Sequence, residues 1–295
     1  MSHYVLAVSG LGNVVGTGAA VARLFAREPG YRVALISRPR KEVHDLKDEI
    51  AKGGGVAEVF SVEEYSYQSM NKVFEDIKKH WPDGRLKCAV WNTSQWFVLR
   101  FSSSSFLMAD ARSRRSRIPF LDITEKDITA SATINIISAT SFSQAAVRAF
   151  TAPGSDPDQG GTLIMTGATS ATRGHTHFGA FAAGKHGLRA LSQSIAREYG
   201  PQGVHVAFVV RPAPPPLPSP ACTDHLCAQI IDGTILTRIT ARMFSSIEGK
   251  DPNWMQDECQ RLSPDSIARA YLYLHQQTPD AWTLEMDLRP AKEKF

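Results

Sequence analysis

Apolar runs of strand length alternate with amphipathic stretches along the first part of the chain. The apolar runs occupy residues 5–8, 33–36, 56–59 and 88–91. Between them, residues 19–27, 42–52 and 69–80 carry apolar side chains at helical spacing. Parallel strands need a crossover connection, which is usually a helix, so this alternation favours a parallel sheet with helices packed on it.

The pattern resumes in the second half of the chain. Residues 127–150 form a long helical stretch, and a strand at 162–166 follows a pair of glycines. A helix at 182–199 and a strand at 204–210 complete the series. The two halves together predict a Rossmann-type α/β fold, a doubly wound parallel sheet, in a single domain that spans residues 1–295.

Two segments, at about 100–117 and 211–230, break the pattern. The first is rich in Ser and Arg, and the second contains six prolines, so neither supplies a central strand. We expect irregular insertions, for which two interpretations remain open. They are lid loops over a substrate, or they are translated non-coding sequence from an unspliced gene. If residues 211–230 are removed, residue 210 joins residue 231, and the segment that ends at Thr237 follows the last strand directly. This observation favours the second interpretation.

Composition narrows the class of protein. The chain is 43% hydrophobic and 21% charged, which is typical of a globular protein. No apolar run approaches the ~20 residues of a membrane span, and the N-terminus leads directly into a strand, so we expect a cytoplasmic protein without a membrane partner. Cys222 and Cys227 flank His225, but this spacing fits no usual zinc site, so we expect no metal.

The net charge of +4 is local. Residues 100–117 contain five Arg and one Asp, a sum of +4, so the rest of the chain is neutral. One charged stretch favours a solvated loop over a nucleic-acid interface. The expected partner is therefore a small-molecule substrate, not a nucleic acid.

A glycine-rich turn follows the first strand and opens the first helix. Gly12 permits a sharp turn, Gly16 lets the backbone approach a pyrophosphate, and Gly18 lets the helix pack closely on the sheet. Thr17 lies at the helix start, where free N–H groups and the positive end of the helix dipole attract phosphates. This strand-turn-helix context predicts a dinucleotide site.

The end of the second strand indicates which dinucleotide binds. An NAD site places a carboxylate there for the ribose 2′-hydroxyl, whereas this chain has no acid before Glu42. Arg38 stands there instead, with Arg40 and Lys41 nearby, and a guanidinium suits a 2′-phosphate. The predicted cofactor is NADP(H).

These residues resemble the short-chain dehydrogenase/reductase family. Gly12–Gly18 is similar to its GxxxGxG turn, with Leu11 where the family usually has Thr, and Asn92 matches an Asn of its NNAG segment. Residues 234–237 resemble its PGxVxT segment. The resemblance implies that Asn92, Ile235 and Thr237 contact the cofactor, and that the chain assembles as a homodimer or homotetramer through the helices at 127–150 and 182–199.

The family's chemistry uses an Asn-Ser-Tyr-Lys relay. The resemblance assigns two of its members as catalytic residues: Asn135, and Lys185, which also holds the nicotinamide ribose. Phe181 stands four residues before the lysine, where the family has Tyr, and Ala168 stands where it has Ser. Phenylalanine has no exchangeable proton, so a general acid typically worth ~10²–10⁴ in rate is absent.

Two histidines, His175 and His177, lie between the fifth strand and the following helix. Either they replace the missing acid, or they are exposed loop residues. Two functions follow. The first is an NADP(H)-dependent oxidoreductase with an atypical proton donor that acts on a small organic acceptor, such as an iminium or enone. The second is a catalytically inactive or non-redox protein that retains the cofactor site.

Overall fold

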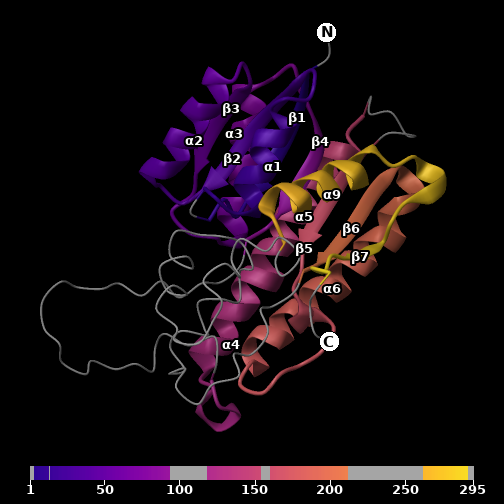
Figure 1. Ribbon diagram of the computed structural model, residues 1–295. Helices are drawn as coiled ribbons and strands as arrows, with labels where there is room; N and C mark the ends of the chain where they lie inside the picture. Colours follow the sequence, from indigo (N-terminus) through magenta and orange to yellow (C-terminus); the bar gives the residue numbers. More distant parts are fainter. Residues whose placement is uncertain (1–2, 13, 94–117, 154–159, 212–261, 292–295) are drawn as a thin grey trace, which may run out of the picture.

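One parallel sheet of seven strands organises the molecule (Figure 1). The computed structural model describes residues 3–12, 14–93, 118–153, 160–211 and 262–291. The strand order is β3-β2-β1-β4-β5-β6-β7, and every neighbouring pair is parallel. The strands are β1 (His3–Ser9), β2 (Tyr31–Ser37), β3 (Val56–Ser61), β4 (Gly84–Trp91), β5 (Gly161–Thr166), β6 (Val204–Val210) and β7 (Glu285–Asp287). The predicted Rossmann-type fold class is confirmed.

The direction of winding reverses between β1 and β4. From β1 the chain runs outward through β2 and β3, then returns to place β4 on the other side of β1. In open parallel sheets the crevice for a ligand lies beyond the carboxyl ends of the strands at such a switch point. The glycine-rich turn and Asn92 follow these two strands directly.

Helices cover both faces of the sheet. Residues from α1 (Thr17–Phe25), α2 (Lys41–Lys52) and α9 (Pro264–Gln276) share one core cluster, and residues from α3 (Tyr67–His80), α5 (Ala139–Phe150) and α6 (Gly179–Tyr199) share the other. Side chains alternate between the clusters along each strand. On β1, Val5 and Ala7 join the second cluster, while Leu6 and Val8 join the first.

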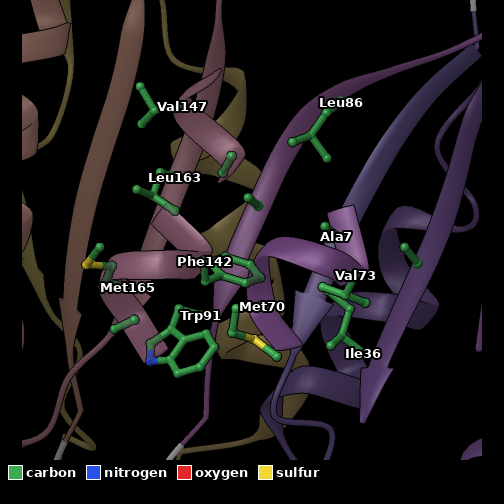
Figure 2. Close-up of a cluster of buried hydrophobic side chains, with 14 of the residues drawn as sticks. Ala7, Ile36, Met70, Val73, Leu86, Trp91, Phe142, Val147, Leu163 and Met165 are labelled. Atoms are coloured by element: carbon green, nitrogen blue, oxygen red, sulfur yellow. The ribbon is translucent and has the colours of Figure 1, made fainter. Parts of the chain in front are cut away.

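Buried apolar side chains, with Trp91 and Phe142 among them, form the cluster under α3 and α5 (Figure 2). The Trp91 and Phe142 rings lie 5.1 Å apart between centroids, and Phe74 contacts Phe142 at the same distance. Both Trp91 and Phe142 are fully buried. This packing fixes the end of β4, where Trp91 pairs with Ser9 at the end of β1.

The helical stretch predicted at 127–150 is not one regular helix. The structure has α4 (Glu125–Ala132), a π-helical turn at Thr133–Ser138, and then α5. A π turn inserts an extra residue into a helix, and such turns occur often at functional sites. Asn135 lies in this turn.

The C-terminal part adds two elements that the hydrophobic pattern did not predict. Helix α9 packs on α1, and the short strand β7 pairs with β6 at the edge of the sheet. An ion pair between Arg189 of α6 and Glu285 of β7, at 2.7 Å, ties this edge to the helix beside it.

Both proposed insertions lie outside the described residues, apart from Arg211 at the start of the second. In the described ranges, no helix has the length and apolar character needed to cross a membrane.

His275 of α9 is half-buried beside two hydroxyl groups. Its Nε2 atom contacts the Tyr31 hydroxyl, and its Nδ1 atom lies 2.9 Å from the Thr162 hydroxyl. Burial lowers the pKa of His275 to about 4, and the positive charge of Lys87 adds to the shift. The folded protein therefore holds this imidazole in its neutral form.

Because the unfolded chain binds a proton more readily at this position, acid should destabilise the fold. The contribution is complete above the ordinary histidine pKa of about 6.5 and should fall by about 3 kcal/mol as the pH drops to about 4. His275→Gln should flatten the fall in the free energy of unfolding measured by urea titration between these pH values. The matched control is His186→Gln, at an exposed position. Equal slopes in both variants would contradict the assignment.

Candidate functional site

The turn after β1 begins with Gly10, where the backbone of Asn92 leaves no room for a side chain. Gly10 has a φ of +85°, and a Cβ atom there would lie 2.4 Å from the carbonyl carbon of Asn92. The Asn92 side chain donates a hydrogen bond from Nδ2 to the Gly10 oxygen at 2.7 Å. Gly10 therefore allows the ends of β1 and β4 to touch backbone to backbone.

Helix α1 packs against the same backbone. A Cβ atom on Gly18 would lie 2.6 Å from the Gly10 oxygen, so only glycine lets the first turn of α1 rest on the end of β1. Gly12, further along the turn, has a φ of +60° and open space around its Cα. The structure thus places Gly12 at the bend and Gly18 at the helix contact. Sequence reasoning missed Gly10, although its position directly after the strand was a usable signal.

The N-terminus of α1 carries no side-chain cap. Gly16 is the N-cap residue, and the first turn contains no acid. The N-termini of α3, α4 and α9 are capped by the hydroxyls of Ser66, Thr124 and Ser263, whereas α2, α5 and α6, like α1, have no side-chain cap. The buried Thr17 hydroxyl has no hydrogen-bond partner among the described residues. The first turn of α1 therefore has backbone N–H groups at the switch point that no side chain caps, and an anion site needs such free donors.

Two arginines follow β2. Arg38 is exposed immediately after the strand, and the half-buried Arg40 donates from Nη1 to the Gly12 oxygen at 2.9 Å. The predicted 2′-phosphate residue therefore lies next to the glycine-rich turn, and Arg40 connects the two loops.

Lys185 lies on α6 and is buried. Its Nζ atom donates to the Thr166 oxygen at the end of β5, at 3.3 Å, and lies 5.8 Å from the centre of the Phe181 ring. Lys185 and Phe181 thus share one face of α6, one turn apart. At the position of the aromatic ring, the site offers an apolar surface.

Asn135 is brought against the same helix. A Cβ atom on Gly184 would lie 2.9 Å from Asn135 Nδ2, so glycine beside Lys185 lets α6 approach the π turn. Nδ2 donates to the Ser131 oxygen at 3.0 Å, while the fully buried Oδ1 atom has no partner within the described ranges. The two residues assigned as catalytic thus lie on elements that pack together at Gly184, the residue before Lys185.

Hydroxyl groups occur close to Ala168, but they are engaged elsewhere. The buried Thr169 hydroxyl accepts a hydrogen bond from Arg289 Nη1 at 3.0 Å. His175 and His177 are exposed. His177 has a φ of +70°, and its oxygen accepts from the Ile118 amide at 2.7 Å. The position of His177 at this contact gives the loop a structural role.

The remaining predicted residues cannot be placed. Ile235 and Thr237 lie outside the described part of the chain. Within that part, no cluster of three or more His, Cys, Asp or Glu side chains could hold a metal ion.

The residues present fit a dinucleotide. The uncapped start of α1 lies at the switch point. The Thr17 hydroxyl there and Asn92 Oδ1 are both buried and have no hydrogen-bond partner among the described residues. A chain of hydroxyl, amide and pyrophosphate groups would satisfy such atoms. Arg38, after β2, and Lys185, on α6, supply positive charge.

Comparison with known proteins agrees with this geometry. Residues 7–214 match the short chain dehydrogenase family. A 3-oxoacyl-[acyl-carrier-protein] reductase from Homo sapiens is 26% identical over 194 residues, which cover 66% of this chain and 69% of the relative.

Solved structures match over almost the whole chain. A short-chain dehydrogenase from Rhodopseudomonas palustris has a TM-score of 0.66 at 24% identity and covers 97% of this chain and 98% of its own. The L-sorbose reductase from Gluconobacter frateurii, solved with NADPH and L-sorbose, has a TM-score of 0.71 at 15% identity, covering 100% and 98%. At these identities the similarity demonstrates a shared fold.

Gly18→Ala tests the backbone contact at the turn. Alanine is the better helix former by about 1 kcal/mol, but its Cβ would meet the Gly10 carbonyl, which cannot rotate away. We expect a net loss of about 1–3 kcal/mol in the free energy of unfolding. Gly53→Ala at the end of α2, where the nearest atom is 3.4 Å away, is the control. Thermal unfolding measures both, and an unchanged melting temperature for Gly18→Ala would contradict the contact.

Proposed function

Since the chain belongs to the short-chain dehydrogenase family, we propose that it is an NADP(H)-dependent oxidoreductase that acts on a small activated acceptor with an atypical proton donor. Members of this family are typically oxidoreductases that use NAD(P). The single observation that carries the proposal is that α6, which bears Lys185, packs at Gly184 against Asn135 of the π turn, in a chain whose glycine-rich turn leads into an uncapped helix.

The charge around β2 supports NADP(H) over NAD(H). Arg38 is exposed at the strand end, and the first acid beyond it, Glu42, lies inside α2. Two structural relatives carry this cofactor form: a metagenomic short-chain oxidoreductase solved with NADP, and the L-sorbose reductase solved with NADPH.

Each residue has a role in this proposal. The turn from Gly10 to Gly18 and the start of α1 hold the pyrophosphate, Arg38 holds the 2′-phosphate, and Lys185 holds the nicotinamide ribose. When bound, the reduced cofactor supplies a hydride. Asn135 Oδ1, buried and without a partner among the described residues, accepts a hydrogen bond from a water molecule next to the substrate.

The chemistry of the substrate follows from the missing phenol. Phe181 cannot donate a proton, so an acceptor that needs protonation during hydride transfer is a poor substrate. An enone accepts hydride at its β-carbon and becomes an enolate, which water can protonate afterwards at the α-carbon. The Lys185 ammonium stabilises the negative charge on the enolate oxygen but repels an iminium cation. Of the two acceptor classes, we therefore propose the enone.

The absence of both family hydroxyls, at Phe181 and Ala168, also supports a second candidate. This is a non-redox or inactive protein that binds the cofactor for stability. Anaerobic mixing with NADPH and a panel of enones, ketones and imines separates the two functions. Loss of NADPH absorbance with an enone supports the oxidoreductase, and tight NADPH binding without hydride loss to any acceptor contradicts it.

Exposed apolar side chains support the proposed homodimer or homotetramer. Ile128 on α4 and Ile136 and Ile137 on the π turn are 38–47% exposed. Together they offer an apolar surface beside α6, on the elements that the family resemblance assigns to assembly.

We expect NADPH to bind more tightly than NADH because the Arg38 guanidinium pairs with the 2′-phosphate. Loss of such a charge-assisted contact costs about 1.5–3 kcal/mol, or roughly a tenfold to hundredfold change in affinity. Arg38→Glu should reverse or abolish the preference, as measured by fluorescence titration. Arg27→Glu, in the turn between α1 and β2 and so at the other end of β2, is the charge-matched control. Equal affinity of the unmodified protein for both cofactors contradicts the assignment.

The double variant Phe181→Tyr, Ala168→Ser should convert the protein toward ordinary ketone reduction. It places a phenol one turn from Lys185 on the same helix face, so a rate gain of about 10²–10⁴ on ketones is expected. The measurement is NADPH oxidation with a ketone panel, and Phe178→Tyr, with a buried ring nearby, is the control. A double variant that folds and binds NADPH but reduces no ketone shows that the site has diverged beyond the relay.

A further inference from the structure

The glycine-rich turn contains a residue in an unfavourable conformation. Val14 has a φ of +57°, in the left-handed region, where a β-branched residue is a genuine outlier. Its side chain packs against the core cluster under α1, and its amide donates to the Leu11 oxygen at 3.1 Å. Something in the structure must hold this residue, since its intrinsic preference is for extended backbone.

Arg23 makes the contact that can do so. From the last turn of α1, its Nη1 atom donates to the Val14 oxygen at 3.0 Å. Its Nε and Nη2 atoms donate to the two carboxylate oxygens of Glu49 on α2, at 2.7 and 2.8 Å. The guanidinium is planar and its donors are fixed relative to one another, so the bidentate pair with Glu49 aims the third donor at Val14.

We propose that Arg23, anchored by Glu49, is a positioning residue that holds Val14 in the left-handed conformation and so keeps the turn in its cofactor-binding shape. The inference rests on the proposed dinucleotide binding and assigns a function to two residues that do not touch the cofactor. Arg23 lies on α1, beyond the turn, and donates a hydrogen bond to the carbonyl oxygen of Val14.

The orientation of the Val14 carbonyl determines the direction of the next N–H group in the turn. In a turn that contains left-handed residues, successive N–H groups point to one side and form an anion-binding concavity. A carbonyl held by Arg23 fixes the peptide plane between Val14 and Val15, and with it the direction of the next N–H. If Val14 relaxes to a negative φ, this plane rotates and the hydrogen bond to Arg23 breaks.

A second guanidinium acts on the same turn. Arg40, in the loop after β2, donates to the Gly12 oxygen at 2.9 Å. Glycine adopts a positive φ at no steric cost, so Gly12 does not depend on this bond as Val14 depends on Arg23. The difference singles out Arg23 for the test.

The experiment compares Arg23→Gln, Val14→Gly and the double variant in the full chain. NADPH dissociation constants come from fluorescence titration, and hydrogen exchange of the Val14 and Val15 amides reports the turn without cofactor. The control is Arg32→Gln, which breaks a similar bidentate pair with Asp83, at 2.9 and 3.1 Å, at the amino end of the sheet.

We expect Arg23→Gln to weaken NADPH binding about tenfold or more, since it removes a charged hydrogen-bond donor, and to speed exchange at Val14. With Gly at position 14 the turn needs no support, so the double variant should bind within about twofold of Val14→Gly alone. Arg32→Gln should leave the NADPH dissociation constant unchanged.

The outcomes distinguish this inference from the proposed function. If the unmodified protein binds NADPH and Arg23→Gln binds it equally well, the positioning role is overturned while the function stands. A tenfold loss that persists in the double variant also overturns it, because Arg23 would then act other than through Val14. If neither the unmodified protein nor any variant binds NADPH, but exchange of the Val15 amide rises in Arg23→Gln and in the double variant equals that in Val14→Gly alone, the positioning role stands and the function fails.

Discussion

The close backbone contact between Gly10 and Gly18 is the constraint on which the cofactor side of the molecule depends. A Cβ atom at Gly18 would meet the Gly10 carbonyl, and one at Gly10 would meet the backbone of Asn92. With neither Cβ present, α1, β1 and β4 converge at a single point. The uncapped start of α1 therefore lies over the switch point of the sheet, where the dipole and free N–H groups can act on a phosphate.

A second close contact builds the reaction side. Gly184 lets α6 approach the π turn, so the helix that bears Lys185 packs against Asn135, which comes from between α4 and α5. Lys185 is further fixed by the carbonyl at the end of β5. Glycine thus permits the close backbone contacts in both halves of the proposed site.

The two halves differ in what they retain. The binding half has its turn, its helix start and Arg38, and the proposed Arg23 support compensates for a valine where a glycine would be unstrained. The chemical half keeps a cation and an amide but has a phenyl ring at Phe181. In the proposed function, binding and charge stabilisation remain available, whereas Phe181 cannot donate a proton. This combination suits a substrate that accepts hydride first and a solvent proton later.

The sequence by itself determined the strands, most helices and the doubly wound fold, because burial on two faces of a sheet imposes periodicities that are local along the chain. It also located Gly12, Gly18 and Arg38, which follow strand ends or open a helix. The tertiary structure alone decided what depends on residues distant in sequence. The contact of Gly10 with Asn92, the π turn packed against Gly184, and the pairing of β7 with β6 belong to this class. Steric fit between separate backbones leaves no periodic signal, so only folding brings those atoms together.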